Sequence, residues 1–418
     1  MDNRTVDARV EELLARMTLE EKAAQMVQVP YAFVGREESL RWARLGAGSF
    51  LHVLGDDARE IQQAAIHESR LGIPVIFGID AIHGHALNDH ATVFPTQLAA
   101  ACSWNPDVAY TMGEVTAREV ASDGLHWTFS PLLCLGCDTR WGRVNETFGE
   151  DPYLTGEMAA AIIRGYQGED LSDGEHILAC AKHYIGYGEA TGARDSYDTE
   201  MTYRKLRETF LPPFQKAVDA GVASIMTAYG SIDGTPFTID SVSLKDILRG
   251  ELGFDGFVVT DWDNVNSLVR RQHVAKDAQE ASVLAARAGN DMIMTSTEFY
   301  DAVVSAVRAG QLQESVLDDA VRRILFNAAQ NQNGRGDPRF AQLPALLRDG
   351  DSQHIRAGAE RRTGYRHRAV AISIRLDHRQ EFRAARHMRA HHAHVVADGF
   401  KINFTDVVSE QRKRQLSD

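Results

Sequence analysis

The sequence predicts an α/β protein, specifically a (β/α)8 TIM-type barrel followed by a C-terminal tail of different composition. Three observations lead to this prediction. Eight short apolar segments alternate with amphipathic ones over about 330 residues, and eight strands close such a barrel. Polar side chains follow the carboxyl ends of these segments, where barrels of this class place their chemistry. The Gly-rich loop typical of an open, doubly wound sheet does not follow the first strand, which makes that fold the second choice.

The individual elements follow from the periodicity of apolar residues. Val10, Leu13 and Met17 are spaced as on one face of a helix, and Thr18 with Glu21 forms a capping box that begins a second helix. Short apolar runs predict strands at 25–29, 49–53, 74–80, 127–133, 177–183, 223–229, 257–261 and 291–295. Amphipathic spacing predicts helical segments at 7–27, 105–122, 154–168, 202–220, 243–252, 276–289 and 314–328.

Composition divides the chain into two parts. Its 418 residues, 44% of them hydrophobic, suffice for a large buried core, which we assign to residues 1–335 as one barrel domain. We interpret residues 336–418 as a linker and an Arg/His-rich tail, with 12 Arg and 7 His between 351 and 418. A truncated or frame-shifted gene would produce such a tail, and so would a genuine basic extension.

The charge distribution argues against nucleic acid as a partner. The net charge is −13, although the tail from 351 onward carries 14 Lys and Arg against 8 Asp and Glu. The rest of the chain is therefore strongly acidic, whereas binding phosphates needs a basic face. The N-terminus begins a charged amphipathic helix in place of an apolar run with a cleavage site, so we predict no signal peptide. We expect a cytoplasmic protein with no membrane partner, and the sequence leaves the oligomeric state open.

Patterns that bind metals are weak in this sequence. Cys134 and Cys137 have the spacing of a zinc half-site, but no second pair accompanies them, so we expect all four cysteines to be packed, reduced thiols. His83 and His85 would suit a metal-dependent barrel hydrolase, which is an alternative function. That function needs further His ligands, and the fifth strand offers only one, preceded by a lysine whose charge would repel a cation. We therefore expect no metal and no cofactor.

The best candidate for a catalytic group is Asp261, which ends the apolar run 257–261. A carboxylate at the carboxyl end of a buried strand is held rigidly while the following loop admits a substrate. Trp262 comes next, and an indole in this place suits stacking on a sugar face, although it would also suit the core. The structural alternative for Asp261 is to cap a helix that begins near Asn264.

Other predicted strands end in polar residues that would share a face of the barrel with Asp261. Lys182 and Arg143 can donate to sugar hydroxyls, and Asp80 can accept from them. Lys182 follows the apolar run 177–181, so we expect it to be buried at a strand end and not to form a surface ion pair. We also expect the two cations to lower the pKa of Asp261 and keep it ionised.

Seven motifs between Val10 and Leu325 are specific in combination. They are Met17-Thr18-Leu19-Glu20-Glu21-Lys22, Asp80-x-x-His83-Gly84, Phe94-Pro95-Thr96, Arg140-Trp141-Gly142-Arg143, Gly149-Glu150-Asp151-Pro152, Lys182-His183 and Thr260-Asp261-Trp262. With them the chain resembles glycoside hydrolase family 3, the retaining β-glucosidases and β-xylosidases, which more often have Ser before the last Asp. The resemblance implies exo-acting hydrolysis of terminal β-D-glucosyl or xylosyl residues through a covalent glycosyl-enzyme on Asp261. It implies a sugar subsite of Asp80, Arg143, Lys182, His183 and Tyr229, to which we add Trp262.

The general acid departs from the family pattern. In two-domain relatives it is a Glu on a following α/β sandwich domain, for which we see no room in this sequence. In single-domain relatives that act on N-acetylglucosaminides it is a His within Asp-Ser-His, where this chain has Asp195-Ser196-Tyr197. The loop 186–189 resembles the glucosidase branch instead. The carboxylates near enough in sequence to substitute are Glu146, Glu150, Asp195 and Asp263.

Two further functions remain as alternatives at this stage. One is a β-N-acetylhexosaminidase-type barrel, and the other is a sugar-binding barrel that has lost turnover. We favour the β-glycosidase because the nucleophile and its cationic neighbours are all present.

Overall fold

Eight parallel strands form the centre of the structure, a computed structural model that describes residues 3–332. Five strands pair in the order β10 (Ile293–Met294), β1 (Val27–Pro30), β2 (Ser49–Leu51), β3 (Ile76–Ile79) and β4 (Trp127–Thr128), and three in the order β5 (Cys180–Tyr184), β6 (Ser224–Thr227) and β9 (Phe257–Val259). Parallel bridges between Trp127 and Leu178 and between Val259 and Met292 join the two sheets at both edges. The strands therefore close into the predicted (β/α)8 barrel, at the eight predicted places in the chain.

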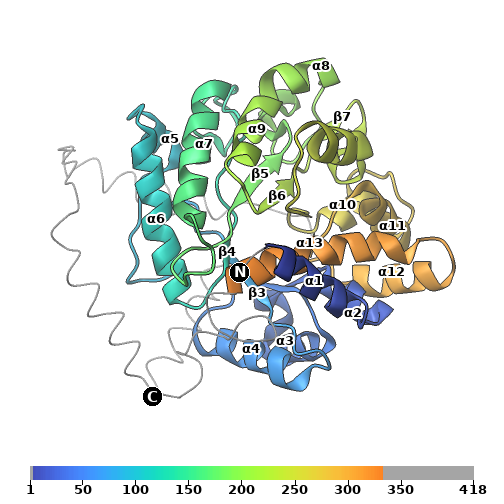
Figure 1. Ribbon diagram of the computed structural model, residues 1–418. Coiled ribbons are helices and arrows are strands. Elements are labelled where there is room, and N and C mark those ends of the chain that lie inside the picture. Colours follow the sequence, from blue (N-terminus) through green and yellow to red (C-terminus); the bar gives the residue numbers. More distant parts are fainter. Residues whose placement is uncertain (1–2, 333–418) are drawn as a thin grey trace. The chain divides into compact units, whose positions relative to one another are not determined.

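Helices follow the strands and lie around them (Figure 1). The main ones are α3 (Tyr31–Leu45), α4 (Gly55–Glu68), α5 (Gln97–Ala101), α6 (Pro106–Ser122), α7 (Pro152–Gln167), α9 (Leu211–Asp219), the π-helix η6 (Val242–Glu251), α10 (Asn264–Arg270), α11 (Ala278–Ala288) and α12 (Phe299–Arg308). Shorter elements are η1 (Val144–Glu146), η2 (Tyr187–Glu189), η3 (Thr191–Ala193), α8 (Tyr203–Lys205), η4 (Leu206–Phe210), η5 (Phe237–Ile239) and a hairpin of β7 (Ser231–Ile232) with β8 (Thr235–Pro236).

Four of these helices, α3, α4, α5 and α12, are absent from the predicted set, and α10 is expected only as a helix that begins near Asn264. Helix α3 contains Gly35, whose positive φ of 77° interrupts the helical spacing. The buried face of α4 consists of Ala and Gln with a single Ile, which leaves a weak apolar stripe in the sequence.

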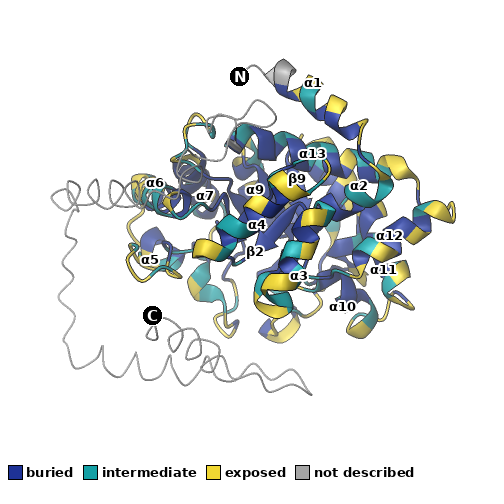
Figure 2. Ribbon diagram, turned by 90° about the horizontal axis from the view of Figure 1, so that it is seen from below, coloured by how far each residue is buried: buried dark blue, intermediate teal, exposed yellow. Residues whose placement is uncertain are grey.

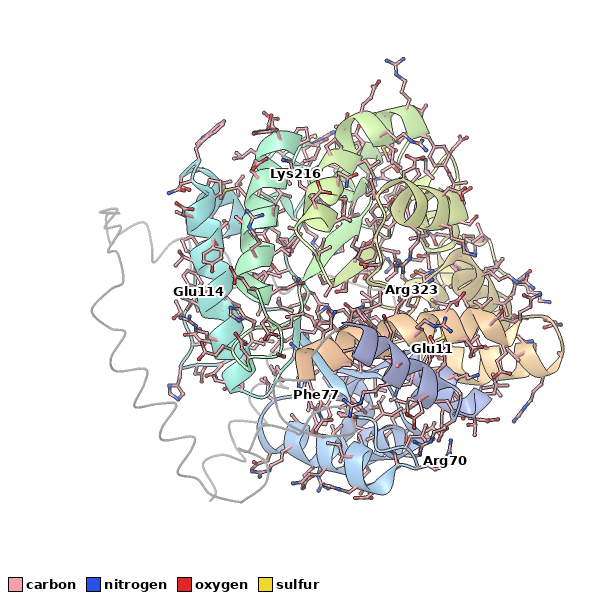
Figure 3. The ribbon with its side chains drawn as sticks, viewed as in Figure 1. Glu11, Arg70, Phe77, Glu114, Lys216 and Arg323 are labelled. Atoms are coloured by element: carbon pink, nitrogen blue, oxygen red, sulfur yellow. The ribbon has the colours of Figure 1, made fainter. Side chains whose placement is uncertain are left out.

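The amino ends of the strands are covered by the first two helices and the last helix of the described chain. These are α1 (Asn3–Leu14), α2 (Leu19–Gln25) and α13 (Glu314–Gln332), and Figure 1 shows α13 beside α1. The predicted capping box is present: Thr18 N–H donates to Glu21 Oε2 at 2.9 Å, and Glu21 N–H donates to Thr18 Oγ1 at 3.3 Å. Lys22 Nζ then ties α2 to α13 through Glu314, at 2.6 Å. Figure 3 labels Glu11 on α1 and Arg323 on α13.

Aromatic side chains fill the barrel interior. The ring of Trp127 packs edge-on against Phe129 and Phe257, with centroids 4.7 and 5.0 Å apart, and its indole N–H donates to Ser224 Oγ at 2.8 Å. A Cβ atom at Gly78 would lie 2.5 Å from the ring of Phe129, so only glycine fits there. Figure 2 shows the strands and the inward sides of the helices as the buried part. The core is therefore packed, and the loops beyond the strands are left to form a site.

Some predictions have a different outcome, and others fall outside the described part of the chain. Cys134 and Cys180 are buried as expected, but Cys102 and Cys137 are exposed because they lie in connections outside the packed core. Within residues 3–332, no helix combines the length and apolar composition needed to cross a membrane. The predicted linker and tail, 336–418, lie outside the described residues.

Candidate active site

Asp261 lies just beyond the carboxyl end of β9 and is buried, with 8% of its surface exposed. One carboxylate oxygen, Oδ1, accepts the backbone N–H of Trp262 at 2.6 Å. The other, Oδ2, is buried and has no hydrogen bond of good geometry to a described residue. At the start of helix α10, Asn264 N–H donates to the backbone carbonyl of Asp261 at 3.2 Å. The side chain of Asp261 is therefore not the cap of that helix. The carboxylate thus has one anchored oxygen and one unpaired oxygen.

Two side chains from neighbouring strands stand beside this unpaired oxygen. The Nε2 atom of His183, on β5, is 3.3 Å from Asp261 Oδ2. The hydroxyl of Tyr229, just after β6, is close enough to lower the pKa of Asp261, although it donates to the carbonyl of Trp262 at 3.0 Å. Three successive strands of the barrel, β5, β6 and β9, therefore meet at Asp261.

Lys182 links Asp261 to a second carboxylate, Asp80, which follows β3. Lys182 is buried as predicted, and its Nζ is 2.8 Å from Asp80 Oδ1. His52 Nε2 is 3.0 Å from the other oxygen, Oδ2. Desolvation in the barrel mouth would raise the pKa of Asp80, but the charge of Lys182 and the hydrogen bond from His52 outweigh it and hold the pKa well below its usual range. Asp80 is therefore an ionised acceptor for hydroxyl groups.

Arg143 approaches from the loop after β4, where η1 begins. Its Nε and one NH2 group bind Glu146 in a bidentate pair at 2.7 and 2.9 Å. The guanidinium also lies over the ring of Tyr187, 5.5 Å from its centroid. Tyr187 in turn donates to Asp195 Oδ1 at 2.6 Å. Arg143 is thus fixed by the loops after both β4 and β5.

The pKa of Asp261 differs from the prediction. Burial raises it above its ordinary value, and the charges of Arg143 and Lys182 lower it without cancelling that effect. Each cation also pairs with another carboxylate, Lys182 with Asp80 and Arg143 with Glu146. The two cations do lower this pKa as predicted, but burial outweighs them and the net shift is upward.

The rim of the site is aromatic. Trp262 is 38% exposed, and its ring contacts that of Phe33 edge-on with centroids 5.0 Å apart. Phe33 lies in the first turn of α3, directly after β1, and is 62% exposed. The indole is therefore not a core residue, and its exposed position suits stacking on a ligand.

The His83-x-His85 pair does not form a metal centre with its neighbours. His85 is buried and turns to Asp123, at the end of α6, with Nε2 2.9 Å from Oδ2. Among the described residues, no cluster of three or more His, Cys, Asp or Glu has the arrangement of a cation site.

The structure brings the predicted site residues to one end of the barrel. Asp80, Lys182, His183, Tyr229 and Trp262 join Asp261 through the contacts above, and Arg143 acts on it through its charge. Sequence reasoning missed four neighbours. His52 directly follows the observed strand β2 but lies inside the predicted strand 49–53, so the rule used at the other strand ends passed over it. The other three, Phe33, Cys134 and Tyr187, lie in apolar contexts that carry no such signal.

Comparison with known proteins identifies the family. Residues 18–326 match the glycosyl hydrolase family 3 N terminal domain. The chain belongs to this family. A solved structure of a β-glucosidase involved in saponin metabolism from intestinal bacteria is 42% identical, with a TM-score of 0.74 over 84% of this chain and 46% of that one.

Curated relatives carry names of two related activities. The periplasmic β-glucosidase of Salmonella typhimurium is 35% identical over 323 residues, which cover 76% of this chain and 41% of the relative. A β-xylosidase of Formosa agariphila is 41% identical over 247 residues, covering 57% of this chain and 34% of the relative. The chain thus spans less than half the length of these relatives.

Proposed function

We propose that this protein is an exo-acting, retaining β-glycosidase in which Asp261 is the nucleophile. The observation that carries the proposal is the unpaired, buried Oδ2 of Asp261. A buried carboxylate oxygen without a partner costs stability, and such cost is typical of groups kept available for chemistry. The neighbouring Lys182 and Arg143 stabilise its ionised form, which is the form that attacks.

The reaction follows from this placement. Oδ2 forms a bond to the anomeric carbon of the terminal sugar, and the electrons of the glycosidic bond leave with the aglycone oxygen, which takes up a proton. Water then attacks the same carbon, loses a proton, and Asp261 leaves as a carboxylate. Two inversions give net retention of the anomeric configuration.

The remaining residues would hold the sugar. Asp80, held by Lys182 and His52, would accept from adjacent hydroxyls, and its side chain is 42% exposed toward a ligand. Lys182 and Arg143 would donate to hydroxyl oxygens, because each retains N–H groups beyond those in its own ion pair. Trp262, at the rim, would stack on a ring.

The substrate class follows from the relatives and not from the geometry. The curated relatives include β-glucosidases and a β-xylosidase, so we propose terminal β-D-glucosyl or β-D-xylosyl residues. A panel of 4-nitrophenyl β-glycosides should show the highest kcat/KM for one of these two and the lowest for the N-acetylglucosaminide. The reverse order would support the hexosaminidase alternative.

The general acid is the open part of the mechanism. Of the four carboxylates considered, Glu146 pairs with Arg143, and Asp195 accepts from the indole of Trp141 and from Tyr187. Asp263 pairs with Arg270 at 3.3 Å, and Glu150 is exposed. Three of them are therefore engaged in other contacts within the described part of the chain.

This arrangement predicts a strong dependence on the leaving group. General acid catalysis contributes about 10² to 10⁴ in rate, and most of that is needed when the leaving group is a sugar hydroxyl. The chain should hydrolyse aryl glycosides far better than disaccharides. Azide should accelerate turnover, because it attacks the glycosyl-enzyme without a general base. Equal efficiency on both substrates with no azide effect would show that a carboxylate of this chain, or of a partner, supplies the proton.

The nucleophile is tested by covalent labelling. A 2-deoxy-2-fluoro glycoside with a good leaving group should label Asp261, and mass spectrometry of peptides locates the label. Asp261→Asn should abolish labelling, whereas Asp263→Asn, two residues away, should keep it. A label on another carboxylate would refute the assignment. Binding of the sugar without labelling or release of the aryl group would support the sugar-binding barrel instead.

A further inference from the structure

Cys134 contacts the edge of the His183 ring that points away from Asp261. Its Sγ is 3.4 Å from His183 Nδ1 and accepts the backbone N–H of His183 at 3.3 Å. Both residues are buried. A continuous line of contacts therefore runs from the thiol through the imidazole to Asp261 Oδ2, which is 3.3 Å from Nε2.

The backbone fixes this alignment. The segment after β4 pairs with β5, as Lys182 N–H donates to the carbonyl of Pro131 at 2.9 Å and Leu133 N–H donates to the carbonyl of Lys182 at 2.5 Å. These bonds place residue 134 opposite residue 183. The contact between thiol and imidazole is thus built into the barrel and does not depend on a mobile side chain.

Protonation limits how the two groups interact. Burial raises the pKa of the Cys134 thiol to about 12, so it keeps its hydrogen at neutral pH. Burial, followed by the charges of Arg143 and Lys182, lowers the pKa of His183 well below its usual range. The imidazole is therefore neutral, with one nitrogen that donates and one that accepts.

Only one arrangement satisfies every group. With the hydrogen on Nδ1, the sulfur of Cys134 would accept both the ring N–H and the backbone N–H of His183, and its own S–H would have no acceptor in the contacts above. The lone pair of Nε2 would then face the negatively charged carboxylate of Asp261. With the hydrogen on Nε2, the thiol donates to Nδ1 and the N–H faces Asp261 Oδ2. The second arrangement leaves no repulsive contact.

We propose that Cys134 is a positioning residue whose thiol donates to His183 Nδ1 and thereby keeps the imidazole hydrogen on Nε2, facing the nucleophilic oxygen of Asp261. This inference rests on the proposed function for the role of Asp261, but the tautomer itself does not. When Cys134 is replaced by a residue without a donor, the hydrogen can move to Nδ1. Asp261 then loses the N–H dipole that faces its Oδ2 atom, and its carboxylate becomes harder to ionise.

The other charged groups around these residues stay in place in such a variant. Arg143, Lys182 and Tyr229 face Asp261, and Arg143, Lys182 and Glu146 are the charged groups near Cys134. A change in the ionisation of Asp261 on replacing Cys134 would therefore arise through His183.

The first experiment reads the tautomer directly. Protein labelled with ¹⁵N-histidine shows, in two-bond ¹H–¹⁵N correlation spectra, which ring nitrogen of His183 carries the hydrogen, and His183→Gln assigns the signal. We expect Nε2–H in the wild type and in Cys134→Ser, whose hydroxyl can still donate. Cys134→Ala should shift the population toward Nδ1–H. Cys180→Ala is the matched control, because this second thiol is equally buried and lies on the same strand, β5, three residues before His183.

The second experiment uses the pH profile of kcat/KM on an aryl β-glucoside. Cys134→Ala should lower kcat/KM at neutral pH roughly three- to tenfold, as expected for one weak hydrogen bond, and move the acid limb to higher pH. Cys134→Ser and Cys180→Ala should keep the wild-type limb. A merely structural role for Cys134 would lower the melting temperature without moving the limb.

The outcomes are decisive in each case. A wild-type spectrum with the hydrogen on Nδ1 overturns the proposal. This test uses the wild-type protein alone, so the proposal stays testable even if Cys134→Ala does not fold. An unchanged tautomer in folded Cys134→Ala also overturns it. Because the spectra are recorded without substrate, a wild type that is inactive but has the Nε2–H tautomer counts against the proposed function and not against the positioning role.

Discussion

Two buried aspartates at opposite ends of the barrel, Asp261 and Asp291, differ in their partners. Asp291 precedes β10, where Arg323 binds Oδ1 at 2.8 Å, and Arg249 and Val258 N–H bind Oδ2, each at 2.7 Å. Asp261 follows β9, and its Oδ1 atom accepts one hydrogen bond, from its neighbour in the chain, whereas Oδ2 has no well-aligned hydrogen bond and only His183 Nε2 at 3.3 Å. Burial raises the pKa of both carboxyls. The two carboxyls are thus alike in burial and differ in how far their oxygens are saturated, which fits a structural role for Asp291 and the proposed chemical role for Asp261.

The two ends of the barrel also differ in their surfaces. Ion pairs of α13 with α1, α2 and Asp291 close the amino end. At the carboxyl end, large apolar side chains are exposed in the connections after the strands or in the first two turns of the helices that follow. All eleven such residues of the described chain lie there: Phe33, Leu54, Leu87, Val93, Trp104, Tyr110, Tyr153, Tyr197, Val242, Trp262 and Val274. The end that holds the candidate site is thus also the end that offers apolar contact surface.

The largest expected effect is on activity, from Asp261→Asn. Loss of the nucleophile should reduce kcat/KM on an aryl β-glucoside by about 10³-fold or more. The midpoint of thermal unfolding should not fall, because the amide removes a buried charge that has few partners. A fall in that midpoint comparable to that of Asp291→Asn would break the distinction between the two carboxylates.

The corresponding change at the other end, Asp291→Asn, should act on stability. It leaves Arg249 and Arg323 without their shared anion, and breaking a buried ion pair costs about 3 to 5 kcal/mol. Denaturant unfolding measures this loss. The activity of each folded molecule should match the wild type, and a catalytic defect in excess of the unfolded fraction would contradict the assignment of Asp291 as structural.

A pair of arginine variants sharpens the comparison through pH. The pKa of Asp261 lies above its ordinary value, so activity should fall as the pH drops through that raised pKa and the nucleophile takes up a proton. Arg143 is the first of the cations that lower this pKa, so Arg143→Met should move the acid limb to higher pH. Arg323→Met should leave the limb where it is. The pH profile of kcat/KM decides, and equal shifts in both variants would point to a general charge effect.

The smallest expected effect concerns Asp80, whose pKa is lowered and not raised. A carboxyl with a depressed pKa in the folded state contributes stability above its unfolded pKa, and this contribution is lost as the pH falls through the folded value. Asp80→Asn should therefore cost on the order of 1 kcal/mol at neutral pH, because solvent screens a partly exposed ion pair. The difference from the wild type should shrink below a pH of about 4. A constant difference from neutral to acid pH would show that the ion pair with Lys182 is not its source.

The sequence by itself determined the barrel and the position of Asp261, the proposed nucleophile, at a strand end. Apolar runs such as 257–261 and the polar residues that end them are local patterns, because strand burial and strand ends depend on neighbouring residues in the chain. The Thr18 capping box is local in the same way and is confirmed. For the same reason the sequence missed α3, where Gly35 breaks the local pattern.

Only the tertiary structure decided how the charges are shared. Lys182 pairs with Asp80 across 102 positions, and Cys134 meets His183 across 49, so both contacts exist only once the barrel closes. Burial in the closed barrel likewise sets the net direction of the pKa of Asp261, because it raises the pKa by more than the charges of Arg143 and Lys182 lower it. Closure removes water from all of these groups at once, and desolvation together with partner geometry depends on three-dimensional neighbours that no local pattern encodes.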